Sequence, residues 1–341
     1  MNNAGDPFER GHNHFDGKAY EQELLHLFFK RFSLNPETSW GYISSGGSES
    51  NEWAIRSAYD KYEKARFYFS KAAHYSIEKT LRLAHKDLYP YTIIDVISST
   101  HEAIDVHKLI AEIQKNYTLK QEVPLLLLTW GTTKLGSIDD VEQITRRLID
   151  LKIPYYCHVD AAFFGGIPPH LKDAPICPNL DTLHADSISI SFHKFFGVPQ
   201  INSIVLSKHK ADGHYVSYIA HRDTTVSGSR SFAIFSATQR IKEVFERTPA
   251  DWYAKNVEWM IKALNEANIP YHRYGLSNIF VIAKPSDKVL RKYHLSSFEG
   301  KKYPDSCAHF IINPFHTIDD LQQLIYDLKE DVKNTPQILD L

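Results

Sequence analysis

Residues 153–162 read Ile-Pro-Tyr-Tyr-Cys-His-Val-Asp-Ala-Ala, and this stretch decides the fold class. The segment Ile153–Val159 is short and mostly apolar, which predicts a buried strand rather than a helix. Asp160 follows at its carboxyl end, and the small residues Ala161 and Ala162 would let a flat ring approach the carboxylate. Ligands of open α/β sheets bind beyond the carboxyl ends of the strands, where a carboxylate can keep a ring nitrogen protonated. An Asp that caps the next turn is the alternative at this position.

Strand and helix signals alternate on both sides of this stretch. Short apolar runs predict further strands at 66–70, 123–129, 186–191 and 201–206. Apolar periodicity and turn signals predict helices at 18–32, at 49–65 and from about 76. Asp139 is the expected N-cap of another helix, which extends to about 151. The alternation favours a mostly parallel sheet covered by helices on both faces.

The segment Ser191-Phe192-His193-Lys194 follows the strand that is expected at 186–191. A lysine directly after a buried strand is well placed to form a Schiff base with a carbonyl cofactor. Taken alone, such a lysine is more commonly a surface residue. Lys194 is therefore a candidate only in combination with other groups.

Three further motifs stand at junctions between strands and loops. The turn Ser44–Ser48 contains two glycines and leads into a helix, an arrangement that favours a phosphate group. His74 follows the strand at 66–70 and could stack on an aromatic ring, and Gly131-Thr132-Thr133 follows the strand at 123–129. Each motif is ordinary by itself. Their order along the chain, together with Asp160 and Lys194, indicates a site for pyridoxal phosphate (PLP).

The character of the sequence changes after about residue 231. Long helices are expected at 231–246 and 251–267, strands at 278–283 and 308–312, and a last helix at 318–333. This pattern predicts a small C-terminal α/β domain. The expected units are an N-terminal arm and helix at 1–39, a large PLP-binding domain at 40–235 and the small domain at 236–341.

Composition and charge exclude several classes of partner. The formal net charge of -2 and the scattered Lys and Arg residues give no reason to expect nucleic acid or an anionic membrane. Cys157, Cys177 and Cys307 are widely spaced, which argues against a disulfide framework or a zinc site. No secretory signal or membrane span is apparent, so a cytoplasmic protein is expected. His12-x-His14 has no obvious third ligand nearby, and no metal is expected.

These motifs resemble the group II PLP-dependent amino-acid decarboxylases, which have the PLP-dependent transferase fold (fold type I). Within that group the sequence is most similar to bacterial histidine decarboxylases and plant serine decarboxylases, over about Gly5 to Asp319. The matching blocks are Trp40-Gly41-Tyr42 with Gly46-Gly47-Ser48-Glu49-x-Asn51, Tyr68-Phe69-Ser70 with His74-Tyr75-Ser76, Gly131-Thr132-Thr133 with Gly136-Ser137-Ile138-Asp139-Asp140, His158-Val159-Asp160-Ala161-Ala162, Ser191-x-His193-Lys194, and Ser227-Gly228-Ser229-Arg230. The resemblance implies a large domain with a seven-stranded, mostly parallel sheet between helices, and a homodimer with shared active sites.

The resemblance also implies a role for each matching residue. Lys194 would form the Schiff base with PLP, Asp160 would bind the pyridinium nitrogen and His74 would stack on the ring. The other contacts implied are Gly47, Ser48 and His193 at the phosphate, Ser191 in the cofactor site, Ser229 at the phosphate of the neighbouring subunit, and Thr132 and Ala162 against the ring.

The expected reaction is decarboxylation of an L-amino acid to its amine, with histidine the favoured substrate and serine the next. Tyr218 or Tyr215 is the candidate acid that protonates Cα. A different PLP reaction on the same fold, an aldol-type cleavage or an elimination, is the alternative. The sequence departs from its relatives at Phe192 and Phe195, which flank the His-Lys pair, and at Ser50 and Gln200.

Overall fold

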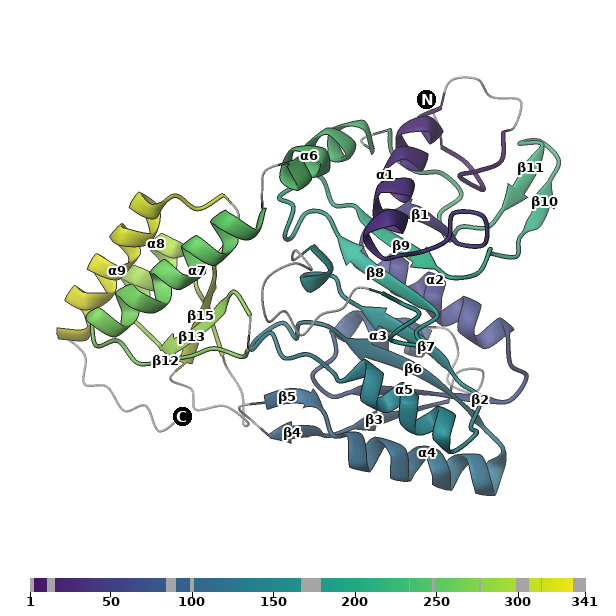
Figure 1. Cartoon of the computed structure of the whole chain (residues 1–341), viewed down its shortest axis with the longest axis horizontal. Coiled ribbons are helices and arrows are strands. Elements are labelled where there is room, and N and C mark those ends of the chain that lie inside the picture. The colour runs from purple at the N-terminus through teal and green to yellow at the C-terminus, as the bar shows by residue number, and fades with distance from the viewer. Residues whose placement is uncertain are drawn as a thin grey trace.

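A seven-stranded sheet forms the centre of the larger part of the chain (Figure 1). The computed structural model describes residues 3–10, 16–83, 90–98, 101–166, 179–232, 234–246, 249–275, 277–298, 307–313 and 315–333. The strands, in their order across the sheet, are β1 (Trp40–Ser44), β9 (Ser203–Ser207), β8 (Ser187–Ser191), β7 (Tyr156–Asp160), β6 (Val123–Thr129), β2 (Ala65–Ser70) and β3 (Tyr91–Ile94). Strand β9 is antiparallel to both of its neighbours, and the other pairs are parallel. The expected α/β class with a mostly parallel sheet is confirmed.

Helices cover both faces of this sheet, as the side chains of strand β6 show. Leu125 and Leu127 point to one face, where they belong to the same buried cluster as Ile55 and Ile77. Those two residues come from helices α2 (Gly47–Asp60) and α3 (Tyr75–Leu83). Leu126 and its alternate neighbour Leu128 belong to the main core on the other face. Helices α1 (Lys18–Arg31), α4 (Val106–Lys120) and α5 (Val141–Asp150) contribute to that core. A strand buried on both faces explains the continuous apolar run at 123–129.

One expected helix cap is wrong by a single residue. Helix α5 is capped by Asp140, whose Oδ1 accepts a hydrogen bond of 2.9 Å from the backbone N–H of Gln143. The carboxylate of Asp139 instead accepts from the backbone N–H groups of Ile104 and Thr129, both at 2.7 Å. Asp139 therefore joins strand β5 (His101–Ile104) to the end of β6. Burial raises the pKa of Asp139 to about 6, against the effect of these two hydrogen bonds.

The C-terminal part of the chain has its own four-stranded antiparallel sheet, in the order β12-β13-β15-β14. Its strands are β12 (Tyr271–His272), β13 (Ile279–Ala283), β14 (Ser296–Ser297) and β15 (Cys307–Ile311). Helices α7 (Pro249–Glu266), α8 (Asp287–Tyr293) and α9 (Ile318–Lys333) accompany it on the left of Figure 1. Helix α6 (Ile234–Glu246) packs against α1 of the larger part. The domain limits at 39 and 235 stay a proposal.

Several elements lie outside the sequence-based expectations. They are helices α4 and α8, strands β1, β3, β12 and β14, the pair β4 (Val96–Ser98) with β5, and the pair β10 (His214–Val216) with β11 (His221–Asp223).

Buried polar contacts order the described residues of the N-terminal arm. Arg230 forms two hydrogen bonds of 2.9 Å with Glu21 and one of 2.8 Å with the carbonyl of Gly5. Lys18 donates to the carbonyl of Asp6 at 2.7 Å.

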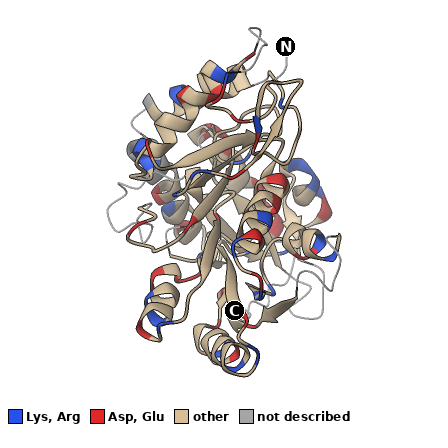
Figure 2. Ribbon diagram, turned by 90° about the vertical axis from the view of Figure 1, so that its right-hand side faces the viewer, with Lys and Arg blue, Asp and Glu red and all other residues tan. Residues whose placement is uncertain are grey.

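Charged residues of both signs are mixed on the surface. Figure 2 shows Lys and Arg interspersed with Asp and Glu along the helices that face the viewer. Within the described ranges, no helix combines the length and the apolar character that crossing a membrane requires.

Candidate active site

Three strands of the large sheet end side by side and place polar residues at one edge. Strand β1 ends at Ser44, β7 at Asp160 and β8 at Ser191, and these strands run parallel to one another. Strand β9 runs the opposite way and begins there with Ser203, which is in register with both Ser44 and Ser191. The edge is therefore the carboxyl-end side of the sheet, where open α/β sheets bind ligands.

A cavity of about 250 Å³ lies at this edge. It is lined by Ser45, Gly46, Gly47, Ser48, Glu49, Asn51, His74, Ser76, Asp160, Ala162, Ser191, His193, Lys194 and Ile201. The fold thus brings most of the residues predicted from the motifs into one lining, although they come from four separate segments of the chain.

Buried phenylalanines hold the segment that carries Lys194. Phe192, Phe195 and Phe196 have no exposed surface, and the rings of Phe192 and Phe28 in helix α1 stack with centroids 5.6 Å apart. The backbone N–H of Phe192 donates to the carbonyl of Asn202 at 2.9 Å. Because the flanking aromatic side chains are anchored in the core, Lys194 remains half-buried and lines the cavity. This packing explains why large residues flank the His-Lys pair.

A glycine and an unpartnered hydroxyl face each other near the start of helix α2. Ser191 Oγ is buried and has no hydrogen-bond partner among the described residues. A Cβ atom at Gly47 would lie only 3.0 Å from it, so the glycine leaves the space before this hydroxyl open. A buried polar atom without a partner is costly. The backbone N–H groups in the first turn of helix α2 also favour an anion at this place. The arrangement fits the phosphate of PLP.

Glu49 ties the phosphate turn to a distant segment. Its carboxylate accepts hydrogen bonds from the backbone N–H of Ser45 at 3.0 Å, from Ser227 Oγ at 2.8 Å and from Tyr42 Oη at 2.9 Å. Burial raises the pKa of Glu49, but a hydrogen bond from Ser45 Oγ together with these three outweighs that effect, and the pKa lies below the ordinary value. An ionised Glu49 therefore fixes the shape of the turn.

Asp160 is the buried carboxylate of the cavity, with 4% of its surface exposed. Its Oδ2 accepts a hydrogen bond of 2.8 Å from Asn51 Nδ2, and its Oδ1 accepts one of 3.1 Å from the backbone N–H of Ala162. Asn51 was quoted in the sequence motif without a role. It lies four residues after Gly47, on the same face of helix α2, and this spacing could have identified it.

The two histidines of the cavity each have Nδ1 in a hydrogen bond and a lowered pKa. The backbone N–H of Ser76 donates to His74 Nδ1 at 3.3 Å, and burial lowers the pKa of His74, with opposing effects from Asp160 and Lys194. His193 Nδ1 donates to the carbonyl of Asn202 at 3.4 Å. Burial is also the main cause of the lowered pKa of His193.

Three predicted residues are not in the lining of the cavity. Thr132 is buried, and its Oγ1 donates to Glu102 Oε2 at 2.6 Å. Tyr218 is 84% exposed between strands β10 and β11, and Ser229 is exposed as well.

His12 and His14, which were considered as metal ligands, lie outside the described residues, as does Cys177. In the described part of the chain, no group of three or more His, Cys, Asp or Glu could hold a metal ion.

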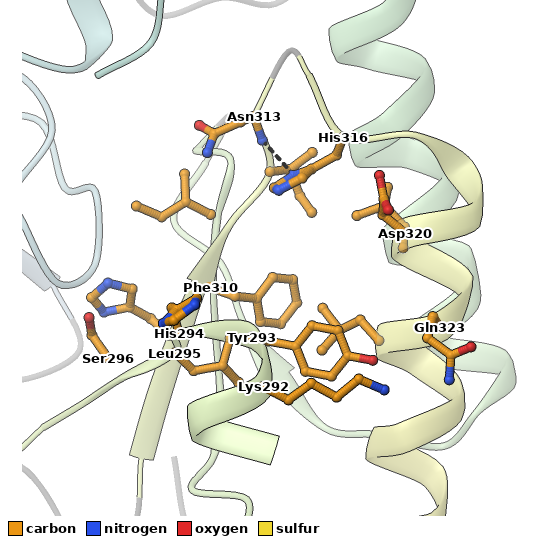
Figure 3. Close-up of a pocket in the computed structure, with 15 residues that line it drawn as sticks. Lys292, Tyr293, His294, Leu295, Ser296, Phe310, Asn313, His316, Asp320 and Gln323 are labelled. Atoms are coloured by element: carbon orange, nitrogen blue, oxygen red, sulfur yellow. Dashed lines mark hydrogen bonds between the residues drawn. The ribbon is translucent and has the colours of Figure 1, made fainter. Parts of the chain in front are cut away.

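A second and larger cavity, of about 700 Å³, lies in the C-terminal part. Figure 3 shows its side chains around the space between strand β15 and helix α9, with Lys292, His316 and Asp320 among them. His316 Nδ1 accepts a hydrogen bond of 3.0 Å from the backbone N–H of Asn313. None of the predicted cofactor residues lines this cavity.

Comparison with known proteins points to one family. The family model described as "Pyridoxal-dependent decarboxylase conserved domain" matches residues 50–244, more than half of the chain. A histidine decarboxylase of Vibrio anguillarum is 33% identical over 96% of this chain and 85% of its own length. One from Pseudomonas entomophila is 30% identical over 93% of this chain and 77% of its own length.

Solved structures show the same fold at lower identity. An L-methionine decarboxylase from Streptomyces sp. 590 superposes with a TM-score of 0.83 at 20% identity, covering 97% of this chain and 87% of that one. The same enzyme has also been solved in its internal aldimine form. Mouse CSAD superposes with a TM-score of 0.71 at 18% identity, covering 92% of this chain and 75% of that one. At these identities the likeness concerns the fold alone.

Proposed function

Since the chain belongs to the pyridoxal-dependent decarboxylase family and is a PLP-dependent amino-acid decarboxylase, we propose that L-histidine is its substrate. The histidine decarboxylases that it resembles are 29–33% identical to it over at least 93% of its length. The single observation that carries the assignment of the site is the cavity at the sheet edge. It combines Lys194, the buried carboxylate of Asp160 and the unpartnered Ser191 hydroxyl in one lining.

The proposed roles of the residues follow from their positions. When bound, PLP supplies a conjugated ring that takes up the electrons released as carbon dioxide leaves the substrate. Lys194 provides the amine to which the cofactor is joined. Asp160 holds a proton on the ring nitrogen, because an ionised carboxylate favours the charged form of its partner. His74 packs on the ring beside Ala162.

The phosphate end has its own set of residues in this proposal. Ser191 Oγ donates to the phosphate, and the amides of Gly47 and Ser48 add donors from the first turn of helix α2. His193 lies at the same end of the cavity. Thr132 would act only from behind the lining, through Glu102.

We further propose that the active unit is a cytoplasmic homodimer with shared active sites. Large apolar or aromatic side chains near the cavity are exposed in the single chain, with exposed fractions of 72% for Tyr75 and 68% for Ile201. Such side chains are typical of an interface. Tyr218 and Ser229 are exposed too, so that each could reach the site of the neighbouring subunit. In that arrangement Tyr218, or Tyr215 with 67% exposure, donates the proton to Cα.

The test is to supply amino acids singly to the enzyme loaded with PLP and to measure carbon dioxide together with the amine product. Release from L-histidine alone, lost in Lys194→Ala, is the expected result. Release from L-serine or another amino acid, with none from L-histidine, would overturn the substrate. Turnover without carbon dioxide would identify the alternative, an aldol-type cleavage or an elimination.

A further inference from the structure

A row of buried polar side chains runs from Asp160 away from the cavity into the protein. Asn51, Ser189, His158, Ser187 and Tyr156 form it, and none of them is more than 5% exposed. The hydrogen-bond distances along it are 2.8 Å from Asn51 Nδ2 to Asp160 Oδ2, 3.1 Å from His158 Nε2 to Asn51 Oδ1, 2.8 Å from Ser187 Oγ to His158 Nδ1, and 2.8 Å from Tyr156 Oη to Ser187 Oγ. The row connects helix α2 with strands β7 and β8.

The carboxylate fixes the orientation of the first amide. An ionised Asp160 can only accept hydrogen bonds, so Asn51 must turn its Nδ2 toward it. The Asn51 carbonyl oxygen then faces inward, where it accepts from Ser189 Oγ at 2.9 Å and from His158 Nε2.

The amide in turn fixes the tautomer of the histidine. Burial lowers the pKa of His158 to about 4, against the effect of Asp160, so the ring is neutral and carries one N–H. That hydrogen is on Nε2, because Asn51 Oδ1 is an acceptor. Nδ1 must therefore accept, and Ser187 Oγ donates to it.

The hydrogen bonds at the far end of the row also have a defined direction. The single hydroxyl hydrogen of Ser187 is used toward His158, so Tyr156 Oη donates to Ser187 Oγ. From Tyr156 to Asp160, each group donates toward the carboxylate. Asp160 receives a donor on each oxygen, from Asn51 and from Ala162.

We propose that Asn51 and His158 are positioning residues that hold the carboxylate of Asp160 directed at the ring nitrogen of the cofactor. This inference rests on the proposed role of Asp160 and adds the residues that support this carboxylate from inside the protein. Asp160 lines the cavity in which the cofactor would bind.

Asn51→Asp in the PLP-loaded enzyme is the direct test, with Asn116→Asp as its matched control. Asn116 is also a buried helical asparagine; its Nδ2 donates to Tyr68 Oη at 3.0 Å, in helix α4. In Asn51→Asp, two carboxylates at hydrogen-bond distance share a proton, and the positive charge on the ring nitrogen is weakened. The nitrogen that joins Lys194 to the cofactor then binds its proton more tightly. We expect the pH midpoint of the visible cofactor band to rise, and kcat to fall about 10- to 100-fold with little change in KM.

A pair of variants at His158 keeps the proposal testable if Asn51→Asp does not fold. His158→Gln retains an N–H that can reach Asn51 Oδ1, whereas His158→Leu fills the space without a donor. We expect the cofactor band of His158→Leu to shift and that of His158→Gln to stay closer to the parent protein. A role confined to filling volume would not separate the two.

The variant Asp160→Asn separates the proposed role of Asp160 from the positioning role of Asn51 and His158. If Asp160→Asn shifts the band and lowers kcat while Asn51→Asp and His158→Leu behave like the control, the positioning role is overturned and the role of Asp160 stands. If Asp160→Asn changes neither quantity, the proposed role of Asp160 fails and this inference fails with it.

Discussion

Two cavities in the described part of the chain differ both in size and in the chemistry of their lining. The larger one, of about 700 Å³, is lined by charged side chains that are exposed, Lys292 and Asp320. Lys292 pairs with Asp327 at its rim. The smaller one, of about 250 Å³, contains the buried Asp160 and the unpartnered Ser191 hydroxyl. A buried carboxylate destabilises a fold unless it has a partner, so the burial of Asp160 favours the smaller cavity as the proposed active site. The proposed active site is therefore the smaller of these two cavities.

The largest expected effect is at the lysine of the smaller cavity. Lys194→Ala removes the amine that is proposed to hold the cofactor, so carbon dioxide release should fall by roughly a thousandfold or more. The visible band of the bound cofactor should disappear as well. Radioactive carbon dioxide capture from labelled substrate measures the first quantity and an absorption spectrum the second. Undiminished turnover in Lys194→Ala would contradict the proposal that the smaller cavity is the active site.

The next effect concerns cofactor affinity. Ser191→Ala removes the hydroxyl that is proposed to donate to the charged phosphate, and it should weaken PLP binding about tenfold or more. The protein without PLP should unfold at the same or a slightly higher temperature, because a buried group without a partner has been removed. Equilibrium titration with PLP and a thermal melt measure the two quantities. A loss of stability with unchanged affinity would show that Ser191 serves the fold.

A third effect is confined to stability and to acid pH. Burial lowers the pKa of His309, in the larger cavity, to about 4 from 6.5. Between these two pH values the unfolded chain binds the proton and the folded chain does not, so stability falls as the pH falls. His309→Phe should reduce this loss by about 1–3 kcal/mol and leave turnover near neutral pH unchanged. Thermal melts across that range provide the measurement. An unaltered pH dependence of melting would contradict the prediction.

The smallest effect is expected at the lysine of the larger cavity. Lys292 is exposed, and its ion pair with Asp327 lies at the surface, where such pairs contribute little. Lys292→Ala should therefore keep carbon dioxide release within about twofold of the parent protein. The same assay that is used for Lys194→Ala gives this value. A large loss of turnover would move the search for the active site to the C-terminal part.

Sequence patterns predicted most of the elements that build the site. The strands expected at 153–159 and 186–191 form as β7 and β8, and the helix expected at 49–65 overlaps α2. Each of these depends on local periodicity or on a continuous apolar run, which the sequence displays directly. Helix α4 has an apolar face as well, and it was overlooked.

Other features depend on contacts that no local pattern encodes. The choice of Asp140 over Asp139 as the cap depends on Asp139 meeting the backbone of Ile104, in another segment. The role of Asn51 depends on its distance from Asp160, far along the chain. Positions that act across a subunit boundary, as proposed for Ser229 and Tyr218, cannot be read from one chain.

The stacking of Phe28 on Phe192 has a consequence for how the protein folds. The loop that presents Lys194 is supported by helix α1, which is made long before that loop during synthesis. The support is therefore a contact of high sequence separation, and such contacts form late and slowly. During refolding, the ability to capture PLP should lag behind the appearance of helical structure. Cofactor capture would then show that the whole large domain has folded. A chain that ends before the segment carrying Phe192 could not bind the cofactor.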